Sequence, residues 1–219
     1  MATTFWHDVA EFTPILIQGA AITVEITFAS LVLSTALGLG WALMRVSRWP
    51  ALALFSKGAV NLIRGIPILV LLFYIYFVLP DVGIQLSAFQ AGTLGLGIAY
   101  SAYMSEVFRA GIEAVDIGQI EAAQSIGMTG GLIMRRVILP QALRIALPPY
   151  GNNLIMLLKD SSQTSAITVA ELAMESKLIA ASSFKNLTVF SLGAVGYLLM
   201  SIPLIILVSR LEKKLGGRK

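Results

Sequence analysis

The sequence has no cysteine, one histidine and few charged residues, and each shortage excludes a class of protein. Without cysteine, a disulfide scaffold, a thiolate metal site and thiol catalysis are all excluded. The single histidine is His7, so neither a histidine-based metal site nor a Ser-His-Asp triad is expected. Charged residues make up 13% of the chain, about half the share in an average soluble domain. This shortage disfavours disorder and a basic nucleic-acid-binding domain.

Apolar residues are correspondingly abundant. They make up 57% of the 219 residues, and the mean hydropathy is +0.81. A soluble fold of this length cannot bury so large an apolar share, so lipid is the expected surrounding of most of the chain. Composition therefore predicts a membrane protein.

Five stretches have the length of a membrane span, for which about 20 mostly apolar residues must cross about 30 Å of hydrocarbon. They are residues 14–44, 60–79, 89–110, 146–167 and 189–208. The fourth is the weakest because polar residues interrupt it, and its helix is expected to begin after Pro148-Pro149. We predict one all-α transmembrane domain over residues 1–219 with five membrane-spanning helices.

The positions of lysine and arginine predict the orientation, because these residues gather on the cytoplasmic side of a membrane protein. None occurs in the first span or the second loop, whereas clusters follow the first, third and fifth spans. This alternation predicts the N-terminus outside the cell and the C-terminus in the cytoplasm, as an odd number of spans requires. Lys177 and Lys185, in the expected fourth loop, run weakly against the rule because Glu171 and Glu175 lie beside them.

The long cytoplasmic loop, about residues 115–144, divides into two halves. Residues 119–126 favour a short helix, which Gly127 and then two further glycines are expected to break. The second half, residues 132–139, is apolar around an arginine pair and stops before a proline. We predict a helix–turn–helix beneath the membrane, whose small residues let another protein approach closely. The alternative is an ordinary loop between spans.

A motif in this loop resembles the EAA loop of ABC importer permeases. The family pattern is EAA, three residues, G, nine residues and I-x-L-P. The matching residues here are Glu121, Ala122, Ala123, Gly127, Leu139 and Pro140. The departure is Val137, which stands where the family has isoleucine.

Further segments resemble one subfamily, the polar amino acid uptake permeases, over about residues 13–211. The similar elements are Arg64-Gly65-Ile66-Pro67, Ser101-Ala102-Tyr103 with Glu106 and Arg109, and Lys159-Asp160-Ser161-Ser162. Two departures affect positions where selectivity is set if they line the path of the solute. Leu71 replaces a common glutamine, and Gln163-Thr164 replaces a more apolar pair.

The resemblance implies a fold, a set of partners and a location. The fold is that of a type I ABC importer permease in the inner membrane of a bacterium, crossing it several times. A second permease chain, identical or homologous, pairs with this one, and a periplasmic or tethered binding protein delivers the amino acid. Two ATP-binding subunits hold ATP and Mg, while this chain binds no cofactor and performs no chemistry. The segment from Glu121 to Gly127 is the coupling helix, and transport follows alternating access.

Ionisable side chains at membrane depth are costly and usually face a cavity or a partner. We hypothesise a substrate path lined by Arg64, Tyr103, Glu106, Asn153, Lys159, Asp160, Ser162 and Gln163. Glu106, Asn153 and Asp160 suit an ammonium group, whereas Arg64, Lys159 and Gln163 suit a carboxylate. The alternative is that Glu106–Arg109 and Lys159–Asp160 are structural pairs, and that Glu25 and Arg64 are also structural.

Other functions fit the residues less well. An intramembrane enzyme lacks a histidine at membrane depth, and its carboxylates alone make no convincing dyad. A channel or scaffolding subunit explains the polar fourth span but does not predict the EAA spacing. Within the transporters, the alternative is a permease for another small nitrogenous solute, such as an opine or a compatible solute. The sequence does not identify the amino acid.

Overall fold

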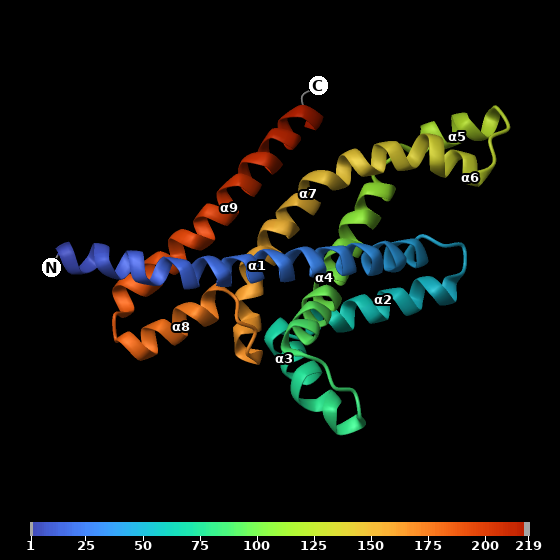
Figure 1. The fold of residues 1–219 in the computed structure, drawn as a ribbon. Helices are drawn as coiled ribbons and strands as arrows, with labels where there is room; N and C mark the ends of the chain where they lie inside the picture. Colours follow the sequence, from blue (N-terminus) through green and yellow to red (C-terminus); the bar gives the residue numbers. More distant parts are fainter. Residues whose placement is uncertain (1, 217–219) are drawn as a thin grey trace.

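The computed structural model describes residues 2–216, and every regular element in them is helical (Figure 1). The α-helices are α1 (Ala2–Arg45), α2 (Pro50–Gly65), α3 (Ile68–Phe73), α4 (Ala88–Glu113), α5 (Ile117–Ser125), α6 (Gly130–Ile133), α7 (Leu139–Asp160), α8 (Leu172–Ser183) and α9 (Asn186–Gly216). The π-helical turns are η1 (Tyr74–Val78) and η3 (Met134–Ile138), and the 3-10 helices are η2 (Leu79–Val82) and η4 (Ser161–Ile167).

The crossing of α1 and α4 lies at the centre of the molecule (Figure 1). Two glycines permit the close approach of α1 and α4 at this crossing. A Cβ atom on Gly38 would lie 2.7 Å from Met104 Cβ and 3.0 Å from the Ser101 carbonyl oxygen. A Cβ atom on Gly97 would lie 2.5 Å from Leu33 Cδ2. Small residues thus let two helix backbones approach closely, as is common within membranes.

The predicted continuous helix over 60–79 is broken in the structure. The chain forms two helical pieces, Pro50–Gly65 and Ile68–Val82, which meet at an angle of 97°. Ile66 is extended, with φ −100° and ψ 127°, because Pro67 disfavours the helical conformation in the residue before it. The break leaves Arg64 at the end of α2 rather than inside a continuous span.

The fourth predicted span also differs from the structure. Helix α7 begins at Leu139 and runs through Pro148 and Pro149 instead of starting after them. Its α-helical part ends at Asp160, and residues 161–167 continue as the 3-10 helix η4. The hydroxyl groups of Ser161 and Thr164 donate to the carbonyl oxygens of Leu158 and Ser161, at 2.8 and 2.6 Å. Such local side-chain bonds compete with regular α-helical pairing.

Helix α8 differs from the prediction, which places its residues in the loop between the fourth and fifth spans. Glu171 precedes it, and the carboxylate accepts hydrogen bonds from the backbone N–H groups of Ala173 and Met174, at 2.9 and 2.8 Å. These bonds satisfy the free donors at the start of the helix. Glu171 is fully buried, so it is a structural cap and not a solvent-exposed loop charge.

Two helices of the described region are long and apolar enough to cross a membrane by themselves. They contain the segments Trp6–Arg45 and Asn186–Lys214, and the bent pair α2 and α3–η2 would make a third crossing. Helices α4 and α7 are long enough, at 26 and 22 residues, but do not meet the same test of apolarity and charge. The chain is therefore a membrane protein by these helices, and the count of five spans stays a prediction.

Candidate functional site

Three of the hypothesised path residues lie in one string of side chains that joins α2, α4 and α7. Asp160 accepts a hydrogen bond from the Tyr100 hydroxyl at 2.7 Å. The rings of Tyr100 and Tyr103 lie 5.8 Å apart, and the Arg64 guanidinium lies 5.7 Å from the Tyr103 ring centroid. The string therefore places a carboxylate and a guanidinium at opposite ends of two aromatic rings, whose planes are tilted by 52° to each other.

Tyr100, which connects Asp160 to this string, is not among the residues predicted from the sequence. Tyr100 is almost completely buried, whereas Tyr103 is 37% exposed. The signal that could have found Tyr100 is its position three residues before Tyr103, which places both rings on one face of α4.

Glu106 belongs to a separate cluster of charges. Its carboxylate accepts hydrogen bonds from Arg109 Nη2 at 2.6 Å and Nε at 3.1 Å, and from Arg45 Nη1 at 3.3 Å. Arg109 also pairs with Glu113. The pairing of Glu106 with Arg109 is thus present, and Arg45 adds a link to α1 that the sequence analysis did not anticipate. Two guanidinium groups already satisfy Glu106, which leaves Asp160 the better candidate for a positively charged solute.

Lys159 and Asp160 face different surroundings, and no salt bridge joins them within residues 2–216. Lys159, Asn152 and Met156 line a groove of about 420 Å³ between α7 and α9, together with Glu212. These three residues share one face of α7. Asp160 instead contacts α4, as its bond to Tyr100 shows.

The remaining hypothesised path residues lie on α7 and on η4, which follows it. Asn153 donates weakly to Met104 Sδ, at 3.9 Å. Ser162 donates to the Lys159 carbonyl oxygen at 2.7 Å, and Gln163 is half-buried in η4. Glu25 is exposed on α1, and its side chain joins none of the ion pairs or hydrogen bonds of residues 2–216. It thus lies apart from both charged clusters.

The predicted helix–turn–helix is present and projects at one end of the molecule (Figure 1). Asp116 caps α5 by accepting a hydrogen bond from the Gly118 N–H at 2.7 Å. Gly127 follows the end of α5 and has φ +79°. Only glycine adopts this left-handed conformation without strain. The expectation that Gly130-Gly131 break the helix is wrong, because these residues begin α6.

The motif residues divide between the inside and the outside of this projection. Ala123 is buried and packs in a small apolar cluster with Val115, Ile133, Ile138 and Ala142. Glu121 and Ala122 are exposed on α5, and Leu139 and Pro140 are exposed at the start of α7. Ile126 is 79% exposed at the tip. Glu121, Ala122 and Ile126 therefore lie on the outer surface of this projection.

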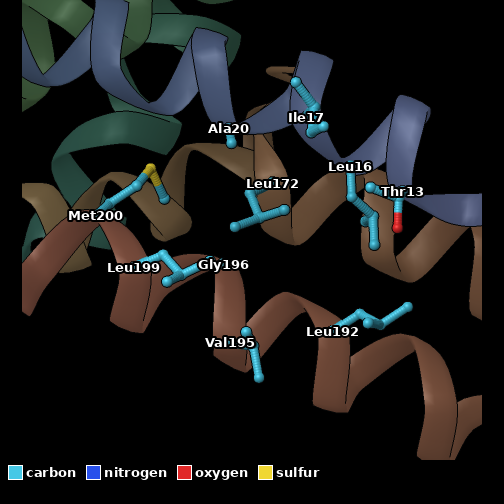
Figure 2. A pocket seen from close by; sticks show the side chains of 10 residues that line it. All are labelled: Thr13, Leu16, Ile17, Ala20, Leu172, Leu192, Val195, Gly196, Leu199 and Met200. Carbon is cyan, nitrogen blue, oxygen red and sulfur yellow. The ribbon is translucent and has the colours of Figure 1, made fainter. Parts of the chain in front are cut away.

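Two other features of the described residues lie away from the hypothesised path residues. A pocket of about 280 Å³ between α1, α8 and α9 has an almost wholly apolar lining, including Leu16, Leu172 and Met200 (Figure 2). Near the N-terminus, His7, Asp8 and Glu11 have potential metal-ligand atoms within 4.8 Å of one another. Asp8 pairs there with Lys185 at 2.5 Å, so an ion pair already accounts for its burial.

Comparison with known proteins gives consistent matches over nearly the whole chain. The family model described as "Binding-protein-dependent transport system inner membrane component" matches residues 34–217. The probable amino-acid ABC transporter permease protein YckA of Bacillus subtilis (strain 168) is 40% identical over 209 residues, which are 93% of this chain and 90% of that protein.

A second relative and a solved structure agree with this match. The probable glutamine ABC transporter permease protein GlnM of Bacillus subtilis (strain 168) is 41% identical over 182 residues, or 83% of this chain and 84% of that protein. A chain described as "Crystal structure of an amino acid ABC transporter with histidines" has a TM-score of 0.89 and 37% identity. The match covers 94% of this chain and 97% of that chain.

Proposed function

Since the chain belongs to the family of binding-protein-dependent transport system inner membrane components, we propose that it is the permease subunit of an ATP-driven importer of a polar amino acid. The observation that carries this proposal is the projecting α5–α6 turn, on which the EAA motif exposes Glu121 and Ala122 around a buried Ala123. Similarity to two probable amino-acid permeases supports the solute class.

The proposal includes a topology of five spans in the inner membrane. The first and fifth spans correspond to α1 and α9, and the bent α2–α3 pair enters as the second. Helices α4 and α7 form the third and fourth, with their polar faces turned from lipid. The N-terminus lies outside and the projecting turn lies in the cytoplasm, as the distribution of lysine and arginine requires.

In the proposed substrate path, Asp160 binds the ammonium group or a basic side chain, and Arg64 binds the carboxylate. The Tyr100 hydroxyl donates a hydrogen bond to Asp160 at 2.7 Å and so orients the Asp160 carboxylate. Asn153, Ser162 and Gln163 complete the polar lining, together with Tyr103 and Lys159. Glu106 lies beside the path, where its hydrogen bond from Arg45 links α4 to α1 and its pairing with Arg109 stays within α4.

The partners follow from the way this family works. Two ATP-binding subunits, carrying ATP and Mg, seat the α5–α6 projections of two permease chains, which are identical or homologous. A periplasmic or tethered binding protein presents the amino acid on the other side. This chain itself performs no catalysis and binds no cofactor. ATP binding and hydrolysis in the partners bias it between outward-open and inward-open states.

The decisive experiment reconstitutes the complete transporter in proteoliposomes with ATP inside. Uptake is measured separately for each L-amino acid, for one opine and for one compatible solute, each of them radiolabelled. We expect ATP-dependent uptake of at least one polar amino acid. Selective uptake of the opine or the compatible solute would replace the proposed solute class, and flux without ATP would indicate a channel.

A further inference from the structure

Helix α8 is attached firmly to the helices on both sides of it. The buried Glu171 carboxylate that caps α8 also accepts a hydrogen bond from the Tyr197 hydroxyl of α9, at 2.5 Å. The backbone N–H of Leu172 donates to Thr23 Oγ1 of α1, at 3.1 Å. These bonds link the start of α8 to α1 and α9 through groups that are largely removed from solvent.

Close backbone packing leaves α8 little room to shift. A Cβ atom on Gly19 of α1 would lie 3.0 Å from Leu172 Cα, and one on Gly193 of α9 would lie 2.7 Å from Ser176 Oγ. Interfaces packed this tightly do not deform gradually, because any displacement produces overlap or voids. Helices α1, α8 and α9 are therefore joined at the first turns of α8, beside the apolar pocket between them, and these three helices are named the α1–α8–α9 body.

One side chain of α8 reaches away from this body to η4. Lys177 Nζ donates to Ser165 Oγ at 2.8 Å, and Ser165 is buried. The segment η4 directly follows Asp160 and carries Ser162 and Gln163, both of which line the proposed path. Lys177 thus connects the α1–α8–α9 body to the wall of that path.

The segment η4 needs such support. A 3-10 helix of 7 residues is long for its type, and its hydrogen bonds have poorer geometry than those of an α-helix. It ends at Thr168, a β-branched residue in the left-handed region with φ +66°. A conformation of this kind persists only where the surrounding structure holds it. At this end of η4, the Tyr76 hydroxyl lies 3.3 Å from Thr168 Oγ1.

We infer that Lys177 is a positioning residue of the substrate path, which acts through Ser165 to hold η4 in the shape that receives the solute. The role in transport rests on the proposed function, whereas the effect on η4 does not. The sequence does not point to this role, because Lys177 lies in a predicted loop, where it affects the predicted orientation only weakly.

The first test measures the mobility of η4 without any substrate. Because the chain has no cysteine, a single Ser161→Cys substitution places one thiol at a fully buried position of η4. Its rate of reaction with a small water-soluble thiol reagent, in the complete transporter, reports local opening. In this background we expect Lys177→Met to raise the rate about five-fold, the effect of one lost hydrogen bond, and Lys177→Arg to restore it.

Two further variants make this test decisive. Ser165→Ala removes the same hydrogen bond from the other side, so it should raise the rate similarly, with no further increase when combined with Lys177→Met. Lys185→Met is the matched control, because Lys185 pairs with Asp8 at the far end of α8 and should leave the rate unchanged. Unchanged rates in both Lys177→Met and Ser165→Ala, or an equal rise in Lys185→Met, would overturn the inference.

The second test measures the transport role. Using the L-amino acid that the unmodified transporter takes up fastest, we expect Lys177→Met to raise the KM of uptake about five-fold, more than it lowers the maximal rate. An unchanged KM would overturn the role in transport. If the unmodified transporter takes up no amino acid, the proposed function fails, while the labelling experiment still decides what Lys177 does to η4.

Discussion

At the scale of single residues, hydrogen-bond partners distinguish the carboxylates of the proposed path. Glu106 is close to two arginines, whereas Asp160 has a neutral partner, the Tyr100 hydroxyl. Both carboxylates are equally prominent in the sequence, and only the contacts separate them. A neutral hydrogen-bond donor orients a carboxylate without cancelling its charge.

This difference predicts the effect of removing the Asp160 charge. We expect Asp160→Asn to lower the initial rate of amino acid uptake about ten-fold or more, because a hydrogen bond to a charged group contributes about 1.5–3 kcal/mol. The matched control is Glu25→Gln, which removes an exposed carboxylate on α1 that lies apart from this string. Uptake measured in proteoliposomes at equal protein content decides the matter, and equal rates in both variants would contradict the assignment.

At the scale of elements, two glycines of α1 that are two residues apart have opposite surroundings. A Cβ atom on Gly38 would meet Met104 Cβ at 2.7 Å, whereas one on Gly40 would meet nothing within 4 Å. We expect Gly38→Ala to destabilise the crossing of α1 and α4 by about 1–3 kcal/mol, the usual cost of overpacking. Gly40→Ala should have almost no effect. Thermal unfolding of the detergent-solubilised transporter measures both, and equal midpoints would show that the crossing tolerates the added methyl group.

The α5–α6 turn gives a second prediction about an element. Gly127 has φ +79°, where a β-branched residue is strained by about 1–2 kcal/mol or more. We expect Gly127→Val to distort the turn, leaving the protein in the membrane while substrate-stimulated ATP hydrolysis falls to the basal rate. The control is Gly131→Val, since Gly131 has ordinary helical geometry and open space around it. Full stimulation in the Gly127→Val transporter would contradict the coupling role.

At the scale of the whole molecule, the length of α1 constrains its position in the membrane. Its 44 residues extend about 66 Å at 1.5 Å per residue, twice the thickness of the hydrocarbon layer. A helix of this length must tilt strongly or project beyond the membrane. Its N-terminal part packs against α8 and α9, where Lys185 pairs with the buried Asp8.

The orientation of the molecule can be tested with single cysteines, because the natural chain has none. Gln85 is exposed between η2 and α4, and Ser125 is exposed at the end of α5. We expect a membrane-impermeant thiol reagent to label the Gln85→Cys variant in intact spheroplasts. The Ser125→Cys variant should be labelled only in inverted vesicles. The reverse pattern would overturn the predicted topology.

Local patterns explain how much of the fold could be predicted. Hydropathy located the apolar parts of α1, α4 and α9, because exposure to lipid requires an apolar surface along the helix. The motif spacing located the α5–α6 turn, because Gly127 and the small residues act within a few positions of one another. The bend at Pro67 has a local cause, the proline itself. The long apolar run after Pro67 nevertheless favours a single continuous span. Helix α8 is not apolar enough for hydropathy to detect it. Its cap, Glu171, resembles an ordinary loop charge in the sequence.

The sequence by itself determined that the chain lies in a membrane, that the α5–α6 turn carries the EAA motif, and which polar residues are candidates for the proposed path. The tertiary structure decided which of these residues have partners. Tyr100 and Asp160 are 60 residues apart, Arg45 and Glu106 are 61 apart, and Thr23 and the N–H of Leu172 are 149 apart. Hydropathy and motif spacing are properties of neighbouring residues, whereas each of these contacts depends on how distant helices cross.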